Sequence, residues 1–156
     1  MQRPIIGYHQ DEKGDWVAEL CCGHGQHIRH KLPFHVRPWV QSAEGRSSML
    51  RTELDCVCCD RFELPEGFVA YKRTPEFNED SIPLGLKRHH STKPGVWAMI
   101  HVLSGQLKYF LDGLDSRELD LDPENAGIIL PEVLHHVATD GPVRFFIEFY
   151  CRPSLS

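Results

Sequence analysis

The chain contains 156 residues, of which 41% are hydrophobic and 25% are charged, and its formal net charge is −5 at pH 7. This composition is ordinary for a globular protein and fits one domain or two small ones. The acidic balance argues against general nucleic-acid binding, which favours a basic face. No stretch reaches the ~18 apolar residues of a membrane helix, and the first residues lack the apolar run of a signal peptide. We therefore expect a cytoplasmic protein with no membrane contact.

The first third of the sequence predicts a hairpin followed by irregular chain. Residues 5–9 and 16–20 have strand character, and Gly14 suits the positive-φ position of the turn between them. The second strand leads directly into a group of cysteines and histidines. We predict a short helix within residues 42–54, weakened by Gly45.

Five of the six cysteines and five of the ten histidines fall within the first 62 residues. The spacing Cys56-x-x-Cys59 is typical of half a zinc knuckle, and Cys22-Gly-His24 supplies a second half. We predict one structural zinc ion, because four protein ligands leave no open position for catalysis. A metal-free redox pair of thiols is the alternative, since Cys-x-x-Cys also shuttles electrons. The predicted ligands are Cys22, His24, Cys56 and Cys59, with His27 and His30 as alternatives for the histidine.

From Leu64 onward, short strands alternate with turns rich in glycine and proline. Strands are predicted at 68–73, 96–103, 106–111, 126–131, 135–137 and 143–150, with a hairpin turn at Ser104 and Gly105. Many short strands with a turn about every ten residues indicate a β-barrel or jelly roll. The fold is therefore predicted to be mainly β, with a zinc-ribbon-like hairpin module over residues 1–62 and a barrel domain over residues 63–156.

Paired histidines mark a second candidate site in the barrel, at residues 89–90 and 135–136. One histidine near an early strand and another from a late hairpin can meet at the barrel mouth, where imidazoles suit zinc, iron or nickel. Strand alternation turns one histidine of each pair outward. His101 is expected to pack or lie at the surface. The candidate ligands for a small molecule or a second divalent metal are His90, His135, His136 and Glu148, the last of which fits a paired surface carboxylate equally well.

Two resemblances add to this interpretation. The segments Gly14-Asp-Trp-Val-Ala-Glu-Leu, Cys22-Gly-His and Arg37-Pro-Trp-Val resemble a small bacterial family of unknown function over about residues 1–62. The segments His90-Ser-Thr-Lys-Pro-Gly-Val-Trp97 and Val143-Arg-Phe-Phe-Ile-Glu-Phe-Tyr150 resemble the cupin-like domain that precedes the methyltransferase in some tellurite-resistance B proteins. That domain also occurs alone in proteins linked to nitrate and nitrosative stress. The second resemblance covers about residues 63–156.

The cupin resemblance implies a double-stranded β-helix, the jelly-roll barrel, and a homodimer. By position, His90 and His135 match the recurrent histidines of that family, while general cupin spacing favours His136. The usual His-x-His pair with a following Glu is replaced by Thr92, Lys93 and hydrophobic residues. No glycine-rich strand-to-helix loop for S-adenosylmethionine is present, so methyl transfer is not expected of this chain.

Three functions follow from these patterns. The first is a non-enzymatic stress-response protein, in which the zinc-stapled module is fused to a barrel that binds a small molecule, an oxyanion or a metal. The second is a metal-dependent enzyme that uses His90 and His135, with Glu148 completing the ligand set. The third is an interaction or nucleic-acid adaptor built on the N-terminal module, which the net negative charge disfavours.

Overall fold

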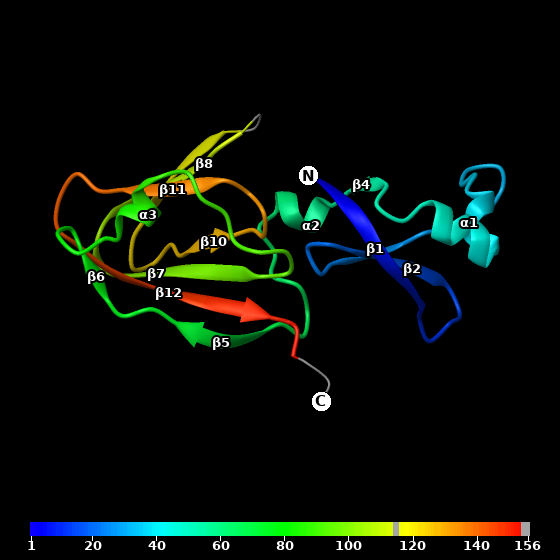
Figure 1. The fold of residues 1–156 in the computed structure, drawn as a ribbon, viewed down its shortest axis with the longest axis horizontal. Helices are drawn as coiled ribbons and strands as arrows, with labels where there is room; N and C mark the ends of the chain where they lie inside the picture. The colour runs from blue at the N-terminus through cyan, green and yellow to red at the C-terminus, as the bar shows by residue number, and fades with distance from the viewer. Residues whose placement is uncertain (114–115, 154–156) are drawn as a thin grey trace. The chain divides into compact units, whose positions relative to one another are not determined.

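The computed structural model describes residues 1–113 and 116–153 and divides the chain into two compact units, Met1–Glu66 and Gly67–Ser156. Strands predominate in both units, and all the pairings between named strands are antiparallel (Figure 1). The predicted mainly-β class is therefore confirmed. No helix in the described part of the chain is long and apolar enough to cross a membrane.

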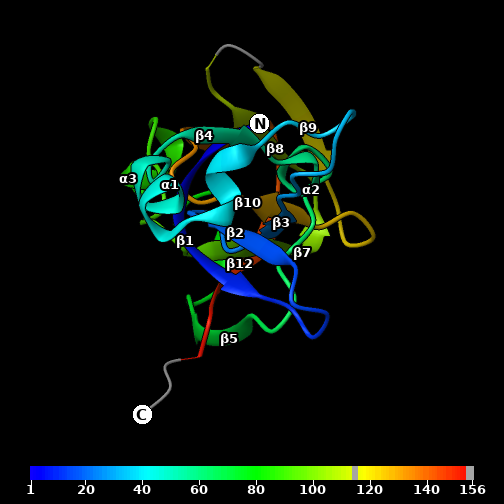
Figure 2. The same ribbon diagram turned by 90° about the vertical axis from the view of Figure 1, so that its right-hand side faces the viewer.

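The N-terminal unit contains a four-stranded sheet in the order β3-β2-β1-β4. These strands are β1 (Gln2–Gln10), β2 (Trp16–Leu20), β3 (Gly25–His27) and β4 (Glu53–Asp55). The predicted hairpin is confirmed, because β1 pairs with β2 and Gly14 has a φ of 82° in the turn. Figure 2 shows β1 and β2 side by side. The sheet buries Ile5, Val17 and Leu20.

Short helical segments connect and follow these strands. They are the 3-10 helix η1 (Pro38–Gln41), α1 (Ala43–Ser48) and α2 (Val57–Asp60). The predicted helix within 42–54 is present as α1 but covers only six residues. Its N-cap is Ser42, whose side-chain oxygen accepts a hydrogen bond from the backbone of Gly45 at 3.0 Å. Helix α2 follows Cys56 directly and thereby shapes the second cysteine group.

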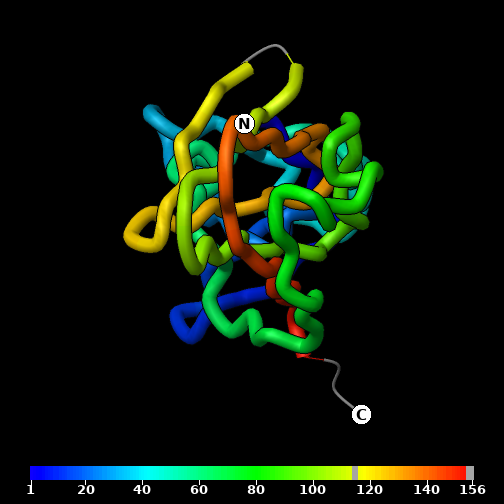
Figure 3. Tube along the Cα trace, turned by 90° about the vertical axis from the view of Figure 1, so that its left-hand side faces the viewer, coloured from blue at the N-terminus to red at the C-terminus, as the bar shows by residue number. Residues whose placement is uncertain are grey.

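The C-terminal unit contains two antiparallel sheets. The larger has the order β10-β7-β12-β5, with β6 also paired to β12, and the smaller has the order β11-β8-β9. The strands are β5 (Val69–Arg73), β6 (Phe77–Asn78), β7 (Trp97–Gly105), β8 (Leu107–Leu111), β9 (Arg117–Leu121), β10 (Gly127–Ile129), β11 (His135–Ala138) and β12 (Val143–Cys151), and α3 (Leu84–Lys87) is a short helix. Figure 3 views this unit end-on.

Alternating residues from these strands form the apolar core of the C-terminal unit. On β12, Val143, Phe145 and Ile147 are buried, as the period of two predicts. Residues from the other strands complete the core, and the largest are Trp97, Ile100, Leu107 and Tyr109. Among these, Tyr109 also donates a hydrogen bond from its hydroxyl to the carbonyl of Ile128 at 3.0 Å, which satisfies its buried polar atom.

The predicted hairpin at residues 104–105 is wrong. Strand β7 pairs with β10 and β12, whereas β8 pairs with β9 and β11, so the chain changes sheet between them. Gly105 has a φ of 78°, and a Cβ at this position would collide with the carbonyl oxygen of Pro142. The glycine therefore serves a corner where two segments of backbone come close together, which a local turn signal does not distinguish from a hairpin.

Candidate metal centre and histidine clusters

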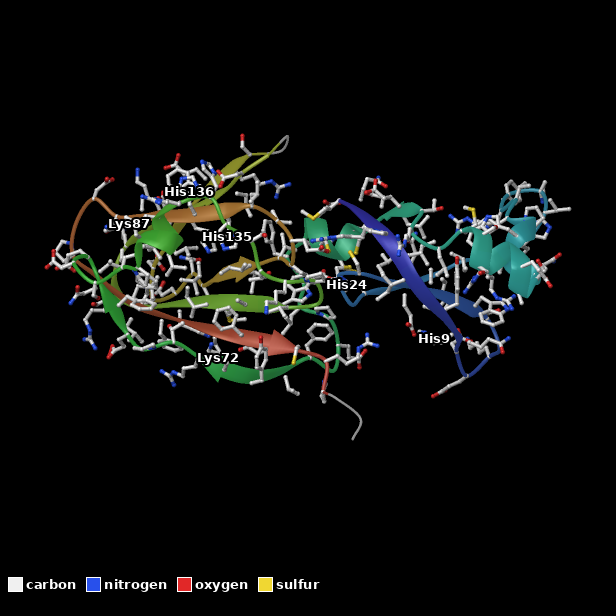
Figure 4. All side chains as sticks on the ribbon, viewed as in Figure 1. His9, His24, Lys72, Lys87, His135 and His136 are labelled. Atoms are coloured by element: carbon white, nitrogen blue, oxygen red, sulfur yellow. The ribbon has the colours of Figure 1, made fainter. Side chains whose placement is uncertain are left out.

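Cys22, His24, Cys56 and Cys59 come together in the N-terminal unit. One ligand atom from each lies within 4.8 Å of the others, and all four residues form a buried group. Cys22 and His24 lie in the turn between β2 and β3, where Gly23 has a φ of 97°. Cys56 precedes α2 and Cys59 lies within it, so one helical turn directs both thiols to the same point. In Figure 4, His24 lies next to sulfur atoms of this unit.

The separations between these atoms fit a tetrahedral ion. Zinc bonds of about 2.3 Å to sulfur and about 2.0–2.1 Å to nitrogen place two sulfurs about 3.8 Å apart and a sulfur and a nitrogen about 3.6 Å apart. The Sγ atoms of Cys22 and Cys56 are 3.9 Å apart. His24 Nδ1 is 3.4, 3.5 and 3.7 Å from the Sγ atoms of Cys22, Cys56 and Cys59. The cluster can therefore hold a metal such as zinc.

The opposite nitrogen of His24 fixes the orientation of its ring. Nε2 lies 2.8 Å from the backbone carbonyl oxygen of Glu63, which can only accept a hydrogen bond. Nε2 therefore carries the proton, and the lone pair of Nδ1 faces the three sulfurs. This second contact is typical of histidines that bind metals.

Burial and mutual contact control the ionisation of the thiols. A hydrogen bond with Cys22, together with burial, raises the pKa of Cys59 to about 12, and burial raises the pKa of Cys56. Without a metal these thiols stay protonated, and metal binding releases their protons. Arg3, only 4% exposed, lies close to the cluster. Burial acts to lower its pKa, but the electrostatic attraction of Cys59 in its thiolate form and a hydrogen bond with that residue outweigh it and raise the pKa. A zinc ion held by three thiolates would have a net charge of −1, which the guanidinium of Arg3 would offset.

The alternative ligands have other partners. His27 Nε2 is 2.9 Å from Asp11 Oδ2, and His30 Nδ1 accepts a hydrogen bond from the backbone of Arg37 at 2.9 Å. Neither histidine joins the cluster, so the structure brings His24 and not the alternatives to the cysteines. All six cysteines are free thiols, and Cys21, Cys58 and Cys151 are partly exposed outside the cluster.

In the C-terminal unit, His90 and His135 lie opposite each other. Their backbones exchange two hydrogen bonds of 3.0 and 2.8 Å, and their ring centroids are 4.1 Å apart. His135 is 1% exposed, and burial lowers its pKa to about 4, so its ring is neutral at pH 7. His90 Nδ1 donates to the carbonyl of Arg88, and His135 Nδ1 donates to the carbonyl of Val133, each at 2.9 Å. Among the described residues, Nε2 of His135 has no hydrogen-bond partner.

His89 and His136 lie on the other face of the β-bridge that His90 and His135 form. His136 is on the partly exposed face of β11, while His135 is on its buried face (Figure 4). His89 and His136 both contact Asp112, with Nδ1 to Oδ2 distances of 2.7 and 2.9 Å. Burial acts to raise the pKa of Asp112, but the hydrogen bonds from His136 and His89 outweigh it and lower the pKa.

Glu148 lies with His101 and Tyr150 and does not join His90 and His135 in a ligand group. Its Oε1 is 3.5 Å from Nε2 of His101 and accepts a hydrogen bond from the Tyr150 hydroxyl at 2.5 Å. That bond raises the pKa of Tyr150 to about 12. Glu148 occupies the face of β12 opposite the core, because the buried residues of this strand are its odd-numbered neighbours.

Three residues at these sites were not among the ligands predicted from sequence, namely Arg3, Asp112 and His89, the last of which was noted only as the neighbour of His90. His89 carried a signal, because it adjoins a predicted ligand and strand alternation sends it to the opposite face. Arg3 and Asp112 carried none, since their positions depend on how distant segments pair.

Comparison with known families supports a resemblance to a family of unknown function in the first part of the chain and to tellurite-resistance B proteins in the second. Residues 6–63 match the model of a protein of unknown function, DUF3565, and residues 72–147 match the model of the TehB-like domain. The first part of the chain is therefore similar to DUF3565, and the second part is similar to the TehB-like domain. Its second half is homologous to TehB.

The relatives cover this second half. A probable S-adenosyl-L-methionine-dependent methyltransferase TehB from Haemophilus influenzae is 29% identical over 89 residues, which are 54% of this chain and 31% of TehB. The uncharacterized protein YeaR from Escherichia coli K12 is 27% identical over 103 residues, which are 60% of this chain and 86% of YeaR. The chain therefore spans about a third of the length of the TehB relatives it matches.

Two solved structures resemble the same part of the fold. The crystal structure of TehB from Haemophilus influenzae has a TM-score of 0.52 and 26% identity, and the match covers 56% of this chain and 32% of that one. The crystal structure of a protein from Escherichia coli K12 has a TM-score of 0.53 and 24% identity, and it covers 59% of this chain and 98% of that one. At that identity the second likeness concerns the fold alone.

Proposed function

We propose that the chain is a metal-binding stress-response protein of the tellurite-resistance type. In this proposal, a zinc ion staples the N-terminal unit and has a structural role, and a cupin-like C-terminal unit binds a small oxyanion. The homology to TehB supports the link to tellurite resistance. We propose no catalytic role for this zinc, because its four protein ligands would leave no coordination position open to a substrate.

The observation that carries this proposal is the tetrahedral spacing of three sulfurs and one imidazole nitrogen. The separations of 3.4 to 3.9 Å leave room for an ion with ordinary zinc bond lengths. A redox pair would use only two of the three cysteines. It would leave the aligned nitrogen of His24 without a role.

Metal analysis of the purified chain tests the zinc site. We expect one zinc per chain in the wild type and its loss in Cys22→Ser and Cys56→Ser. Cys58→Ser is the matched control, because Cys58 is in the same helical turn but outside the cluster. A wild-type chain free of metal under reducing conditions, or zinc loss in Cys58→Ser alone, contradicts the proposal.

The arrangement of strands supports the cupin-like barrel. Strands β7, β10 and β12 belong to one sheet, whereas β8, β9 and β11 belong to the other, so the chain passes repeatedly between the sheets. Such alternation between two antiparallel sheets is the pattern of a jelly roll. The buried residues of both sheets form one core.

A groove of about 290 Å³ in this unit has the chemistry of an oxyanion site. Its lining includes Lys72, Lys93, Ser91 and Thr92. The two ammonium groups and the Ser91 hydroxyl can neutralise and hydrogen-bond a small anion such as tellurite or nitrite, whereas the Thr92 hydroxyl donates to the carbonyl of Val96 at 2.8 Å. Figure 4 labels Lys72 on β5, at the edge of the larger sheet.

Thermal unfolding with sodium tellurite, selenite or nitrite tests this part of the proposal. A bound anion raises the Tm of the C-terminal unit, and the rise grows with the logarithm of the anion concentration relative to its Kd. We expect the rise to disappear in Lys72→Ala/Lys93→Ala and to persist in Lys87→Ala, which removes a lysine outside this groove. Equal shifts in both variants, or no shift with any of the anions, contradict it.

A second candidate function is a metal-dependent enzyme that uses His90 and His135. The specific observation is that both rings donate Nδ1–H to a backbone carbonyl two residues earlier, as metal-bound histidines do. The two Nε2 atoms would then hold a divalent metal that polarises a substrate. A second, exchangeable iron or zinc that disappears in His135→Ala favours the enzyme; a single zinc that survives this change favours the structural role alone.

A further inference from the structure

We propose that His89, Asp112 and His136 form a second metal site, open to solvent, for a borderline divalent ion such as Ni²⁺, Cu²⁺ or Zn²⁺. His136 lies on the face of β11 opposite His135, and His89 and Asp112 contact each other and His136 on that side. The site is therefore separate from the oxyanion groove and from the inner histidine pair.

The three ligand atoms already converge. Asp112 Oδ2 is 2.7 Å from His89 Nδ1 and 2.9 Å from His136 Nδ1, and the ligand atoms of the group all lie within 4.8 Å of one another. Bonds of about 2.0–2.1 Å place neighbouring ligands about 3 Å apart, so the two distances to Asp112 fit an ion after shifts of a few tenths of an ångström, and the exposed His89 ring is free to adjust. Each ring then carries its proton on Nε2 and presents Nδ1 to the ion.

The strands hold two of these ligands in place. His136 pairs with Phe110 across β11 and β8, and the two rings stack with centroids 4.5 Å apart at 7°. The backbone N–H of Asp112 donates to the carbonyl of Leu134 at 2.8 Å. The side chains of Asp112 and His136 are only 17% and 24% exposed, whereas His89 is 68% exposed. Asp112 and His136 are thus held close together, and the exposed His89 leaves room for an ion to enter from solvent.

The ligand types indicate which ions bind. Two imidazoles and one carboxylate suit zinc, copper, nickel and ferrous iron, while magnesium and calcium prefer oxygen ligands alone. Three protein ligands also leave coordination positions open. His136 lines a groove of about 700 Å³ that Lys87 and Glu79 also line, so small molecules can reach an ion held there.

Isothermal titration with NiCl₂ tests the site in the full-length chain without a polyhistidine tag. The protein is first loaded with one zinc per chain, so that the cysteine cluster is filled. We expect one Ni²⁺ per chain and a loss of affinity of at least about tenfold in Asp112→Asn, His136→Asn and His89→Asn. His89→Asn changes an exposed side chain, so it reports on the site even where a change at Asp112 disturbs folding.

Two controls separate this inference from the proposed function. His101→Asn removes another histidine beside a carboxylate and should leave Ni²⁺ binding unchanged. X-ray absorption should show nitrogen and oxygen neighbours around nickel and no sulfur. No Ni²⁺ binding, unchanged binding in His89→Asn and His136→Asn, or loss of binding in His90→Asn alone overturns the inference; the last result would instead place nickel at the inner pair. None of these outcomes bears on zinc in the cysteine cluster.

Discussion

In the N-terminal unit, four ligands from two distant segments converge on one buried point, whereas in the C-terminal unit four histidines are divided between two faces of a bridge. The first arrangement depends on turns and a short helix, which can direct neighbouring residues to the same point. The second depends on extended chain, which sends neighbouring residues in opposite directions. The same residue type therefore forms one closed cluster in one unit and two different groups in the other.

The two units also differ in how they are stabilised. The N-terminal unit has few large buried side chains outside its sheet, and three of its fully or nearly buried residues are the cluster cysteines. The C-terminal unit buries Trp97, Tyr109 and Phe145 completely. Small apolar cores need a metal or another staple, whereas larger ones do not. We therefore expect metal removal and core truncation to act on different units.

Removal of the proposed zinc ion should give the largest effect. Structural zinc contributes about 10–16 kcal/mol of apparent folding free energy in small zinc domains. Addition of a strong chelator should therefore abolish hydrogen-exchange protection within Met1–Glu66 and leave it within Gly67–Ser156 unchanged. Hydrogen exchange measured by mass spectrometry reports on both units at once. Retained protection in the N-terminal unit would show that its core is sufficient without metal.

Truncation of the C-terminal core should give the converse result. Phe145 is fully buried, and its ring centroid lies 5.6 Å from that of Phe77. Phe145→Ala leaves a cavity and should lower the free energy of unfolding of this unit by about 3–5 kcal/mol. Exchange of amides in the N-terminal unit should not change. An equal loss of protection in both units would show that they unfold together.

Acid should destabilise the metal-free C-terminal unit through His135. Its pKa is lowered by burial from 6.5 to about 4, so the unfolded chain binds a proton more readily. Stability is therefore complete above pH 6.5 and falls as the pH decreases toward 4, by roughly 3 kcal/mol in total. Urea unfolding of wild type and His135→Asn at pH 7 and pH 4.5 isolates this contribution, and parallel losses in both proteins would exclude it.

The smallest effect is expected at the corner between the two sheets. Gly105→Ala places a Cβ against the carbonyl of Pro142 at a φ of 78°, which should destabilise the C-terminal unit by about 2 kcal/mol. Gly95→Ala is a suitable control, because its φ of 72° is close to that of Gly105 but a Cβ there meets no atom within 4 Å. Urea unfolding of the two variants compares crowding with backbone strain, and an equal loss in both would leave strain alone as the cause.

Local spacing was enough to anticipate the cysteine cluster. The three-residue step from Cys56 to Cys59 corresponds to one turn of helix, and Cys22 and His24 are separated by a single glycine. The choice of His24 over His27 and His30 follows from structure, because those histidines find partners in Asp11 and Arg37. The sequence spacing therefore predicted the cysteine cluster, but it did not show that Asp11 and Arg37 bind the two alternative histidines.

Long-range pairing limited what the sequence could predict in the C-terminal unit. The strands around Gly105 were located correctly, but whether they pair with each other depends on β10 and β12, which lie far along the chain. Strand β9 was missed, since charged residues separate its apolar ones. Asp112 joins the histidines only because β8 and β11 pair in a particular register.

The bridge between His90 and His135 restricts insertions and deletions in the short segment before His135. A shift of one residue in strand register moves every side chain to the opposite face. Deletion of a single residue between Pro131 and His135 would place His136 in the interior and expose its neighbour, without altering either side chain. Insertions and deletions in this short connection would therefore exchange the roles of two identical residues, so its length matters more than its sequence.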